Sequence, residues 1–179
     1  PISRCARYGH LSALRVLIEQ GVKIDIRLND GATPLIISTG EQHSGVVRAL
    51  LEDGADPNAQ NLEGTTAILL AALTGRADII RTLIAGGADP DTRNSFKESL
   101  LFLVVERDFA DGVRVLLEAG VNVDSRSPRG WTALMRAAKY GRTSSARALI
   151  ANGANVNAVS KGGATSIMIA AERDQMEMV

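Results

Sequence analysis

The sequence predicts an all-α fold of the solenoid type, in which helix–turn–helix–loop units stack on one another, and three series of residues support this prediction. Glycine recurs every 33 residues, at Gly21, Gly54, Gly87, Gly120 and Gly153. A hydroxyl residue recurs with the same step, at Thr33, Thr66, Ser99, Thr132 and Thr165. A pair of mostly small residues does so too, at Cys5-Ala6, Ser38-Thr39, Ala71-Ala72, Val104-Val105, Ala137-Ala138 and Ala170-Ala171. Three series in one register define a repeat whose core is buried between neighbouring units.

A single period shows why these residues form helices. Thr66 precedes the apolar stretch 68–72, and its side chain can accept a hydrogen bond from a free amide of the first turn. Gly75 favours a turn, because glycine costs about 1 kcal/mol inside a helix. Residues 78–85 then place isoleucine and leucine on one helical face. Gly86-Gly87 ends this second helix, and an extended loop follows.

Composition excludes several classes of function. The chain has 179 residues with 20 basic and 20 acidic side chains, so it lacks the positive charge that drives binding to nucleic acid or anionic lipid. Its one cysteine, Cys5, forms no internal disulfide, which favours an intracellular location, cytoplasmic or nuclear. The apolar run 100–105 is far shorter than the roughly 20 residues of a membrane helix. We therefore expect no nucleic-acid partner and no membrane insertion.

The repeat resembles that of the ankyrin-repeat family. The family pattern GxTPLHxAA…GH…VVxLLxxGADxN is matched over residues 31–58 by GATPLIIST…QHSGVVRALLEDGADPN. It is matched again over 64–91 by GTTAILLAALTGRADIIRTLIAGGADPD, and over 130–157 by GWTALMRAAKYGRTSSARALIANGANVN. The resemblance covers the whole chain and implies a curved stack with a concave binding face.

We expect one array over residues 1–179. Its units are a partial repeat, four full repeats and a second partial repeat, over 1–27, 28–60, 61–93, 94–126, 127–159 and 160–179. Pro1 takes the register of Pro34, so the chain is expected to begin at a first helix and to stop inside a second helix at Val179.

The repeat over 94–126 departs most from the family pattern. Lys97 replaces a turn glycine, Leu100 replaces proline, Val104-Val105 replace the alanine pair, and Asp108-Phe109 replace Gly-His. A lysine at positive φ costs about 1 kcal/mol, and the larger valines should widen the spacing to a neighbouring repeat. We expect this repeat to be a weak link or a bend in the stack.

The histidine that follows TPL in the family is replaced by apolar residues, so burial must substitute for its hydrogen bond. The replacements are Ile36, Leu69, Phe102, Met135 and Met168.

No catalytic or cofactor motif is present: GxGxxG, GxxxxGK[ST], HExxH and GxSxG are all missing from the sequence. His10 and His43 fall at the family's Gly-His turn, and Ser144 and Ser145 are expected on a helix surface with no histidine in their repeat. The recurring aspartates are interpreted as turn residues and not as metal ligands: Asp25, Asp56 and Asp89. We expect a non-enzyme with no cofactor, no metal and no small-molecule substrate.

Function is expected at the positions that the repeat pattern leaves free, beside the turn glycine and after the small pair. The candidates in the second half of the array are Phe96, Arg107, Arg129, Trp131, Lys139 and Tyr140. Those in the first half are Asp30, Glu41, Leu62, Glu63 and Thr74. Four of the six aromatic residues take free positions, at Tyr8, Phe96, Trp131 and Tyr140. Trp, Tyr and Arg dominate the binding energy of protein interfaces, so we predict a patch centred on Trp131. The alternative is that these rings only cover neighbouring loops.

Two functions fit this interpretation. The first is a non-catalytic protein–protein interaction scaffold, which binds a protein partner of unknown identity through loop tips and the first-helix face. The alternative is a regulatory or substrate-recruiting arm of a larger enzyme, channel or ubiquitin-ligase component. Basic free positions in the second half would steer an acidic partner there, although a solvated face without a partner explains them equally. The resemblance also implies hydroxylation as a possible modification of Asn58 and Asn157, which match a loop asparagine modified in some animal ankyrin proteins.

Overall fold

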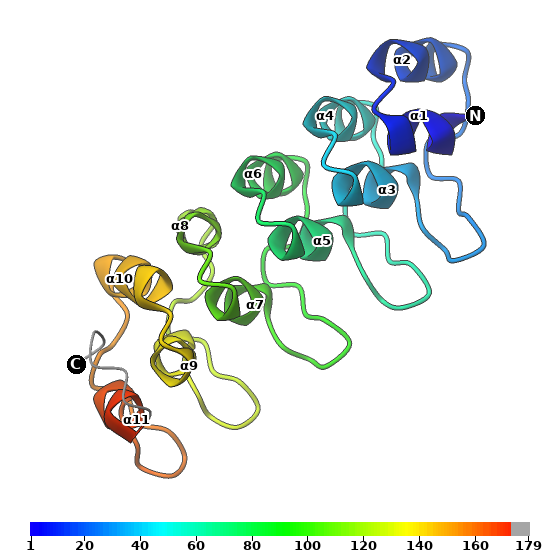
Figure 1. The fold of residues 1–179 in the computed structure, drawn as a ribbon. Helices are drawn as coiled ribbons and strands as arrows, with labels where there is room; N and C mark the ends of the chain where they lie inside the picture. Colours follow the sequence, from blue (N-terminus) through cyan, green and yellow to red (C-terminus); the bar gives the residue numbers. More distant parts are fainter. Residues whose placement is uncertain (173–179) are drawn as a thin grey trace. The chain divides into compact units, whose positions relative to one another are not determined.

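The computed structural model describes residues 1–172, and these residues form helices joined by turns and loops (Figure 1). The first helices of the repeats are α1 (Ile2–Tyr8), α3 (Pro34–Gly40), α5 (Ala67–Leu73), α7 (Leu100–Glu106), α9 (Ala133–Tyr140) and α11 (Ser166–Glu172). The second helices are α2 (Leu11–Glu19), α4 (Ser44–Glu52), α6 (Ala77–Ala85), α8 (Ala110–Glu118) and α10 (Thr143–Ala151). The all-α prediction is confirmed. The second helix expected to reach Val179 lies outside the described residues.

The chain divides into two compact units, and each is described by itself. Unit 1 spans Pro1–Phe96 and contains α1 to α6, while unit 2 spans Lys97–Val179 and contains α7 to α11. In unit 1, α3 packs between α1 and α5, and α4 contacts α2 and α6. In unit 2, α9 packs between α7 and α11, and α8 contacts α10. The single array over 1–179 and its repeat boundaries stay a prediction.

The recurring threonines cap the first helices, as the sequence predicts. The Thr66 hydroxyl accepts a hydrogen bond from the Leu69 amide at 3.4 Å, and the Thr33 and Thr132 hydroxyls accept equivalent bonds at 3.3 Å. Gly75 adopts φ of +70° in the turn between α5 and α6, a conformation that glycine reaches without a Cβ penalty. The predicted helix 78–85 is observed as α6, with Gly86 at its C-cap.

The core consists of the first helices and the inner faces of the second helices. Four of the apolar residues that replace the family histidine are less than 5% exposed, namely Ile36, Leu69, Phe102 and Met135. The expectation of burial is wrong for Met168, which is 55% exposed, because no further helix covers α11 within residues 1–172. Cys5 is a buried free thiol, as predicted for a small-pair position.

The divergent repeat over 94–126 contains the predicted strain. Lys97 adopts φ of +61° and Asp108 adopts φ of +53°, in the left-handed region that favours glycine. The Asp108 side chain makes a contact with the next repeat, where its Oδ1 accepts a hydrogen bond from the Ser145 amide at 2.8 Å. This bond satisfies one of the free amides at the N-terminus of α10. Ser145 itself is fully buried, so its expected place on the helix surface is wrong; Ser144 is exposed as expected.

A partly buried arginine connects the divergent repeat to the next one. The Arg136 guanidinium lies over the Phe102 ring, 5.3 Å from its centroid, and donates to Glu98 Oε1 at 2.7 Å and to Glu106. Burial acts to lower the pKa of Arg136, but the hydrogen bond to Glu98 and the charges of Glu106 and Glu98 outweigh it, so the pKa lies above its ordinary value. Three residues of the divergent repeat thus contact one arginine of its neighbour. Whether this repeat is the weakest or bends the stack stays a prediction.

Candidate partner-binding site

The centre of the predicted patch, in unit 2, is formed by one loop and the end of one helix. The Ser127 amide donates to the Trp131 carbonyl at 2.9 Å, and the Trp131 amide donates to Ser127 Oγ at 3.2 Å. These bonds close the loop and fix Trp131 directly before Thr132, the N-cap of α9. Lys139 and Tyr140 occupy the last turn of the same helix. The structure therefore brings together three of the predicted residues.

A cation lies between two aromatic rings in this cluster. Lys139 Nζ is 5.5 Å from the centroid of the Trp131 ring and 5.0 Å from that of the Tyr140 ring. Both distances lie within the range of about 6 Å at which an ammonium is attracted to the face of a ring. The Lys139 side chain is half-buried beside these rings. We call these three residues the Trp131 cluster.

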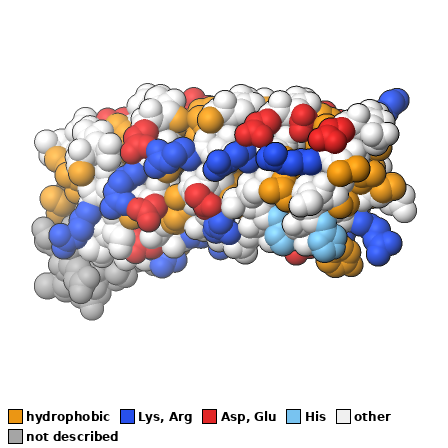
Figure 2. All heavy atoms as spheres, turned by 90° about the horizontal axis from the view of Figure 1, so that it is seen from above, with side chains coloured by type: hydrophobic (Ala, Val, Ile, Leu, Met, Phe, Trp, Pro, Cys, Tyr) orange, Lys and Arg blue, Asp and Glu red, His pale blue; other side chains and the backbone are white. Residues whose placement is uncertain are grey.

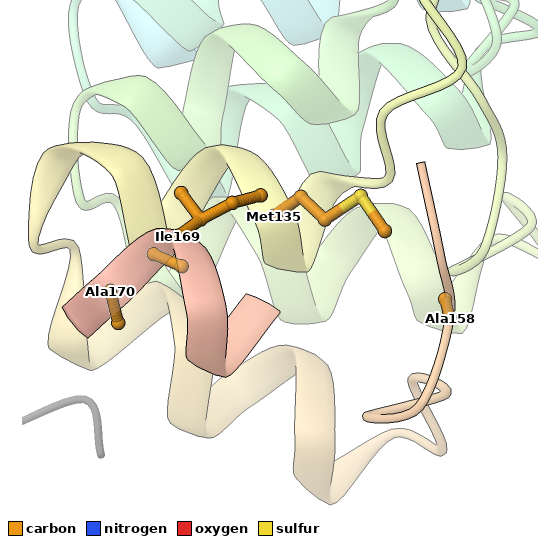
Figure 3. Close-up of a cluster of buried hydrophobic side chains, with 5 residues drawn as sticks. Met135, Ala158, Ile169 and Ala170 are labelled. Atoms are coloured by element: carbon orange, nitrogen blue, oxygen red, sulfur yellow. The ribbon is translucent and has the colours of Figure 1, made fainter. Parts of the chain in front are cut away.

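Trp131 also packs against a cluster of buried hydrophobic residues in unit 2. The Trp131 ring is half-buried against a cluster of hydrophobic residues from α9, α11 and the loop before α11. This cluster consists of Met135, Ala138, Ala158, Ile169 and Ala170, and Figure 3 shows the positions of Met135, Ala158, Ile169 and Ala170. The Trp131 ring therefore contributes to packing in unit 2, and its role in partner binding stays a prediction. Tyr140 is 41% exposed and Phe96 83% exposed, which leaves those rings free for other contacts.

Arg107 and Arg129 are the remaining candidates in unit 2, and both are exposed. Arg107 follows α7, the helix that packs beside α9, and Arg129 lies two residues before Trp131 in its loop. Neither side chain makes a hydrogen bond or ion pair among residues 1–172. The Lys161 ammonium donates to the Pro128 carbonyl at 3.1 Å, which ties the loop of Arg129 to the next loop.

The candidates of unit 1 lie on loop tips and at helix ends. Leu62 is 80% exposed, and its amide donates to the Asp30 carbonyl at 2.9 Å. The Asp30 carboxylate accepts from the Ala32 amide at 3.0 Å and so stabilises its own turn. Glu63 is exposed beside Leu62. Phe96 closes unit 1 whereas Trp131 belongs to unit 2, so their expected grouping stays a prediction.

Thr74 and Glu41 occupy the residue that follows a first helix. The Thr74 hydroxyl donates to the Leu70 carbonyl at 3.0 Å, so this half-buried side chain caps the end of its own helix. Glu41 is exposed directly after α3. Only Glu41 of this pair presents its side chain to solvent in the way a partner contact requires.

The loop asparagines and aspartates link successive loops. Asn58 Nδ2 donates to the Gly87 carbonyl at 3.0 Å, and its Oδ1 accepts from the Asp89 amide at 2.9 Å. Asp25 accepts from the Asp56 amide at 3.1 Å in the same manner. The interpretation of the aspartates as turn residues is confirmed. Asn157 is exposed, and the modification of Asn58 and Asn157 stays a prediction.

Two features of the structure were not predicted from the sequence. One is the set of contacts made by Arg136. Its partners Glu106 and Glu98 lie 30 and 38 residues away in the sequence, and these separations do not match the 33-residue repeat. The other is a series of exposed arginines at one register of the second helices: Arg15, Arg48, Arg81, Arg114 and Arg147. The signal for this series was present, since it recurs with the same 33-residue step as the glycines.

The helix pairs, their threonine caps and the bonds between successive loops define a repeat protein made of helix–turn–helix–loop units. A family model described as "Ankyrin repeats (3 copies)" matches residues 2–94, 68–160 and 101–179. The chain belongs to the ankyrin repeat family.

Solved structures agree with this assignment. The chain is similar to an ankyrin repeat domain from Acinetobacter baumannii, with 30% identity, a TM-score of 0.89, and coverage of 99% of this chain and 93% of that one. It is also similar to the ankyrin repeat domain of Bcl-3, a member of the IκB family, with 28% identity, a TM-score of 0.88, and coverage of 99% and 82%. No curated protein matches the chain by sequence.

Ankyrin repeats are in general protein–protein interaction modules, and they are typically non-catalytic. Within residues 1–172, no group of three His, Cys, Asp or Glu side chains is arranged to hold a metal ion. The same residues include no helix long and apolar enough to cross a membrane.

Proposed function

We propose that this chain is a non-catalytic protein-interaction scaffold, acting in the cytoplasm or nucleus, and that it binds its partner through loop tips and first helices. The single observation that carries the proposal is the Trp131 cluster. Trp131, Lys139 and Tyr140 present two ring surfaces and one cation together, and Trp and Tyr are among the residue types that dominate the energetics of protein interfaces.

The charges around the cluster favour an acidic partner. Arg129 lies in the same loop as Trp131, and Arg107 lies at the end of the neighbouring helix α7. An acidic segment would approach these exposed arginines and place a carboxylate on Lys139, while its apolar side chains contact the Tyr140 ring. Such complementarity raises association rates and selects against basic partners.

The test compares capture of partners from the source cells by the wild-type chain and by Tyr140→Ala, followed by affinity measurements with the partner identified. Tyr140 is 41% exposed, so its truncation should leave the fold intact. Truncating an interface residue of this kind costs about 2 kcal/mol, or roughly 30-fold in Kd. Trp131→Phe provides a second variant that retains part of the packing against the core.

Tyr8→Ala is the matched control. Tyr8 takes the register of Tyr140 in the first repeat and is 57% exposed, so the same substitution is made at an equivalent position. We expect Tyr8→Ala to bind like the wild type. If Tyr140→Ala and Trp131→Phe both retain full affinity for the partner, the cluster is not the binding site and the proposal is wrong.

A further inference from the structure

Two grooves separate successive second helices of unit 1, and they differ in size and in charge. The groove between α2 and α4 has a volume of about 200 Å³ and is lined by Arg15, Ile18, Glu19, Ala49, Glu52 and Asp53. The groove between α4 and α6 has a volume of about 440 Å³, and its lining includes Arg48, Leu51, Glu52, Arg81, Ala85 and Gly86. The first therefore has three carboxylates for one arginine, and the second has two arginines for one carboxylate.

Two substitutions between repeats explain the difference in the number of carboxylates. Glu52 and Asp53, at the end of α4, correspond to Ala85 and Gly86 at the end of α6. The wall formed by α6 therefore carries no acidic side chain where α4 carries two. Gly86 also gives Leu51 room, because a Cβ at this position would lie 2.9 Å from Leu51 Cδ2. The larger groove thus has an apolar floor of Leu51, Ala85 and Gly86.

Arginines at one helical register flank the groove. Arg15, Arg48 and Arg81 are exposed on α2, α4 and α6, and Figure 2 shows Lys and Arg side chains gathered along the face of the second helices. Arg48 makes no hydrogen bond or ion pair within the part of the chain that the structure describes. Arg48 and Arg81 line the groove from its two opposite helices.

We propose that the groove between α4 and α6 binds a peptide segment in which an acidic side chain lies next to an aliphatic one. The carboxylate pairs with Arg48, and the aliphatic side chain contacts Leu51, Ala85 and Gly86. This site lies on the second helices of unit 1 and is independent of the Trp131 cluster in unit 2. Its volume falls within the range of small ligand sites, about 300–1,000 Å³.

The chemistry of the groove favours a carboxylate peptide over a polyanion. Glu52 remains in the lining, and its charge opposes the closely spaced phosphates of a nucleic acid. Arg48 supplies one positive charge in the lining, which matches one carboxylate. The floor of Leu51, Ala85 and Gly86 gains nothing from inorganic anions, but it excludes water around an aliphatic side chain.

The test is an NMR titration of the amide-labelled chain with acetyl-Leu-Glu-Leu-amide, with acetyl-Leu-Gln-Leu-amide as the matched neutral probe. We expect saturable shifts of amides lining the groove, including Gly86. The Glu peptide should bind up to about fivefold tighter than the Gln peptide, as one exposed charge pair of about 1 kcal/mol predicts. Equal affinity for the two peptides would overturn the proposal.

Three variants locate the site. Arg48→Gln should weaken binding of the Glu peptide by up to about fivefold, whereas Arg15→Gln, at the same register beside the smaller groove, should leave it unchanged. Ala85→Glu restores a carboxylate to the α6 wall without altering Gly86 and should abolish binding. If Arg15→Gln and Arg48→Gln weaken binding equally, the arginines act only as a diffuse positive charge.

Other occupants are distinguished in the same titration. Inorganic phosphate or an eight-residue thymidine oligonucleotide that shifts the same amides in the Arg48-dependent manner would make the groove a general anion site and overturn the peptide assignment. Concentration-dependent self-association that Ala85→Glu abolishes would assign the groove to a second copy of the chain instead.

Discussion

The Arg136 contact predicts that one substitution should loosen the divergent repeat from its neighbour. The change is Arg136→Leu, which introduces an aliphatic residue like those at the same register in other repeats, such as Ile37 and Leu70. The variant retains a side chain of reasonable size over the Phe102 ring but removes the partner of two carboxylates. Glu98 and Glu106 then remain close to each other without the guanidinium between them.

The expected loss in the free energy of unfolding follows from the exposure of the charged groups. The Arg136 side chain is 16% exposed, and those of Glu98 and Glu106 are 29% and 31% exposed. Removing one partner of a fully buried ion pair costs about 3–5 kcal/mol, whereas an exposed pair contributes about 0–1 kcal/mol. Because water reaches both carboxylates in part, we expect a loss of about 2 kcal/mol. In a protein of this size that lowers the melting temperature by about 4–8 °C.

The assay is thermal unfolding followed by circular dichroism at neutral pH, with Arg114→Leu as the control. Arg114 pairs with Asp111 on α8, but both side chains are more than half exposed, so this variant should lose less than about 1 kcal/mol. Adding Glu98→Gln and Glu106→Gln to Arg136→Leu should recover part of the loss, because no unpaired charge is left. Equal melting temperatures of Arg136→Leu and the wild type would contradict this prediction. An equal decrease in the melting temperature of Arg114→Leu would contradict it too.

Three further predictions concern caps, strain and pH. Thr66→Ala should cost about 1 kcal/mol in urea unfolding because it removes the cap of α5, whereas Ser99→Ala should be neutral because the buried Ser99 hydroxyl makes no hydrogen bond. Lys97→Gly should stabilise the chain by about 1 kcal/mol by relieving the positive φ, and unchanged stability would argue against strain there. The hydrogen bond from Arg76 lowers the pKa of Asp78, so the pair stabilises the fold above the ordinary aspartate pKa and ceases to do so as pH falls through the lowered value. Asp78→Asn should remove this small acid-dependent part of the melting curve, and an unaltered pH profile would contradict the assignment.

Much of the fold could be predicted from the sequence because its determinants are local and periodic. The threonine caps act within three residues, the turn glycines act at a single residue, and the apolar faces repeat with the helical period. Even the strain at Lys97 was predictable, because the register assigns a glycine conformation to that position. The exposure of Met168 was not, since burial depends on which helices cover a residue.

The candidate site was predicted less completely. The repeat register indicated free positions for Tyr140 and Phe96, and both side chains are exposed. It indicated a free position for Thr74 too, but the Thr74 hydroxyl donates a hydrogen bond to its own helix. Trp131 takes a position that the repeat pattern leaves free, and the structure adds that its ring lies against the core cluster around Met135. The position within a repeat predicts the direction in which a side chain leaves the backbone. The contacts that the side chain makes depend on its length and on its neighbours.

The 33-residue helical repeats of this protein can be predicted from its sequence, because each cap, turn and apolar face is encoded within one repeat and copied in the next. The contacts between side chains of different repeats follow from the three-dimensional structure. It brought Lys139 between two rings, surrounded Arg136 with carboxylates of the preceding repeat, and opened a groove where Ala85 and Gly86 replace acidic residues. These features depend on side chains from separate helices or repeats meeting in space, and no periodic pattern in one chain specifies those meetings.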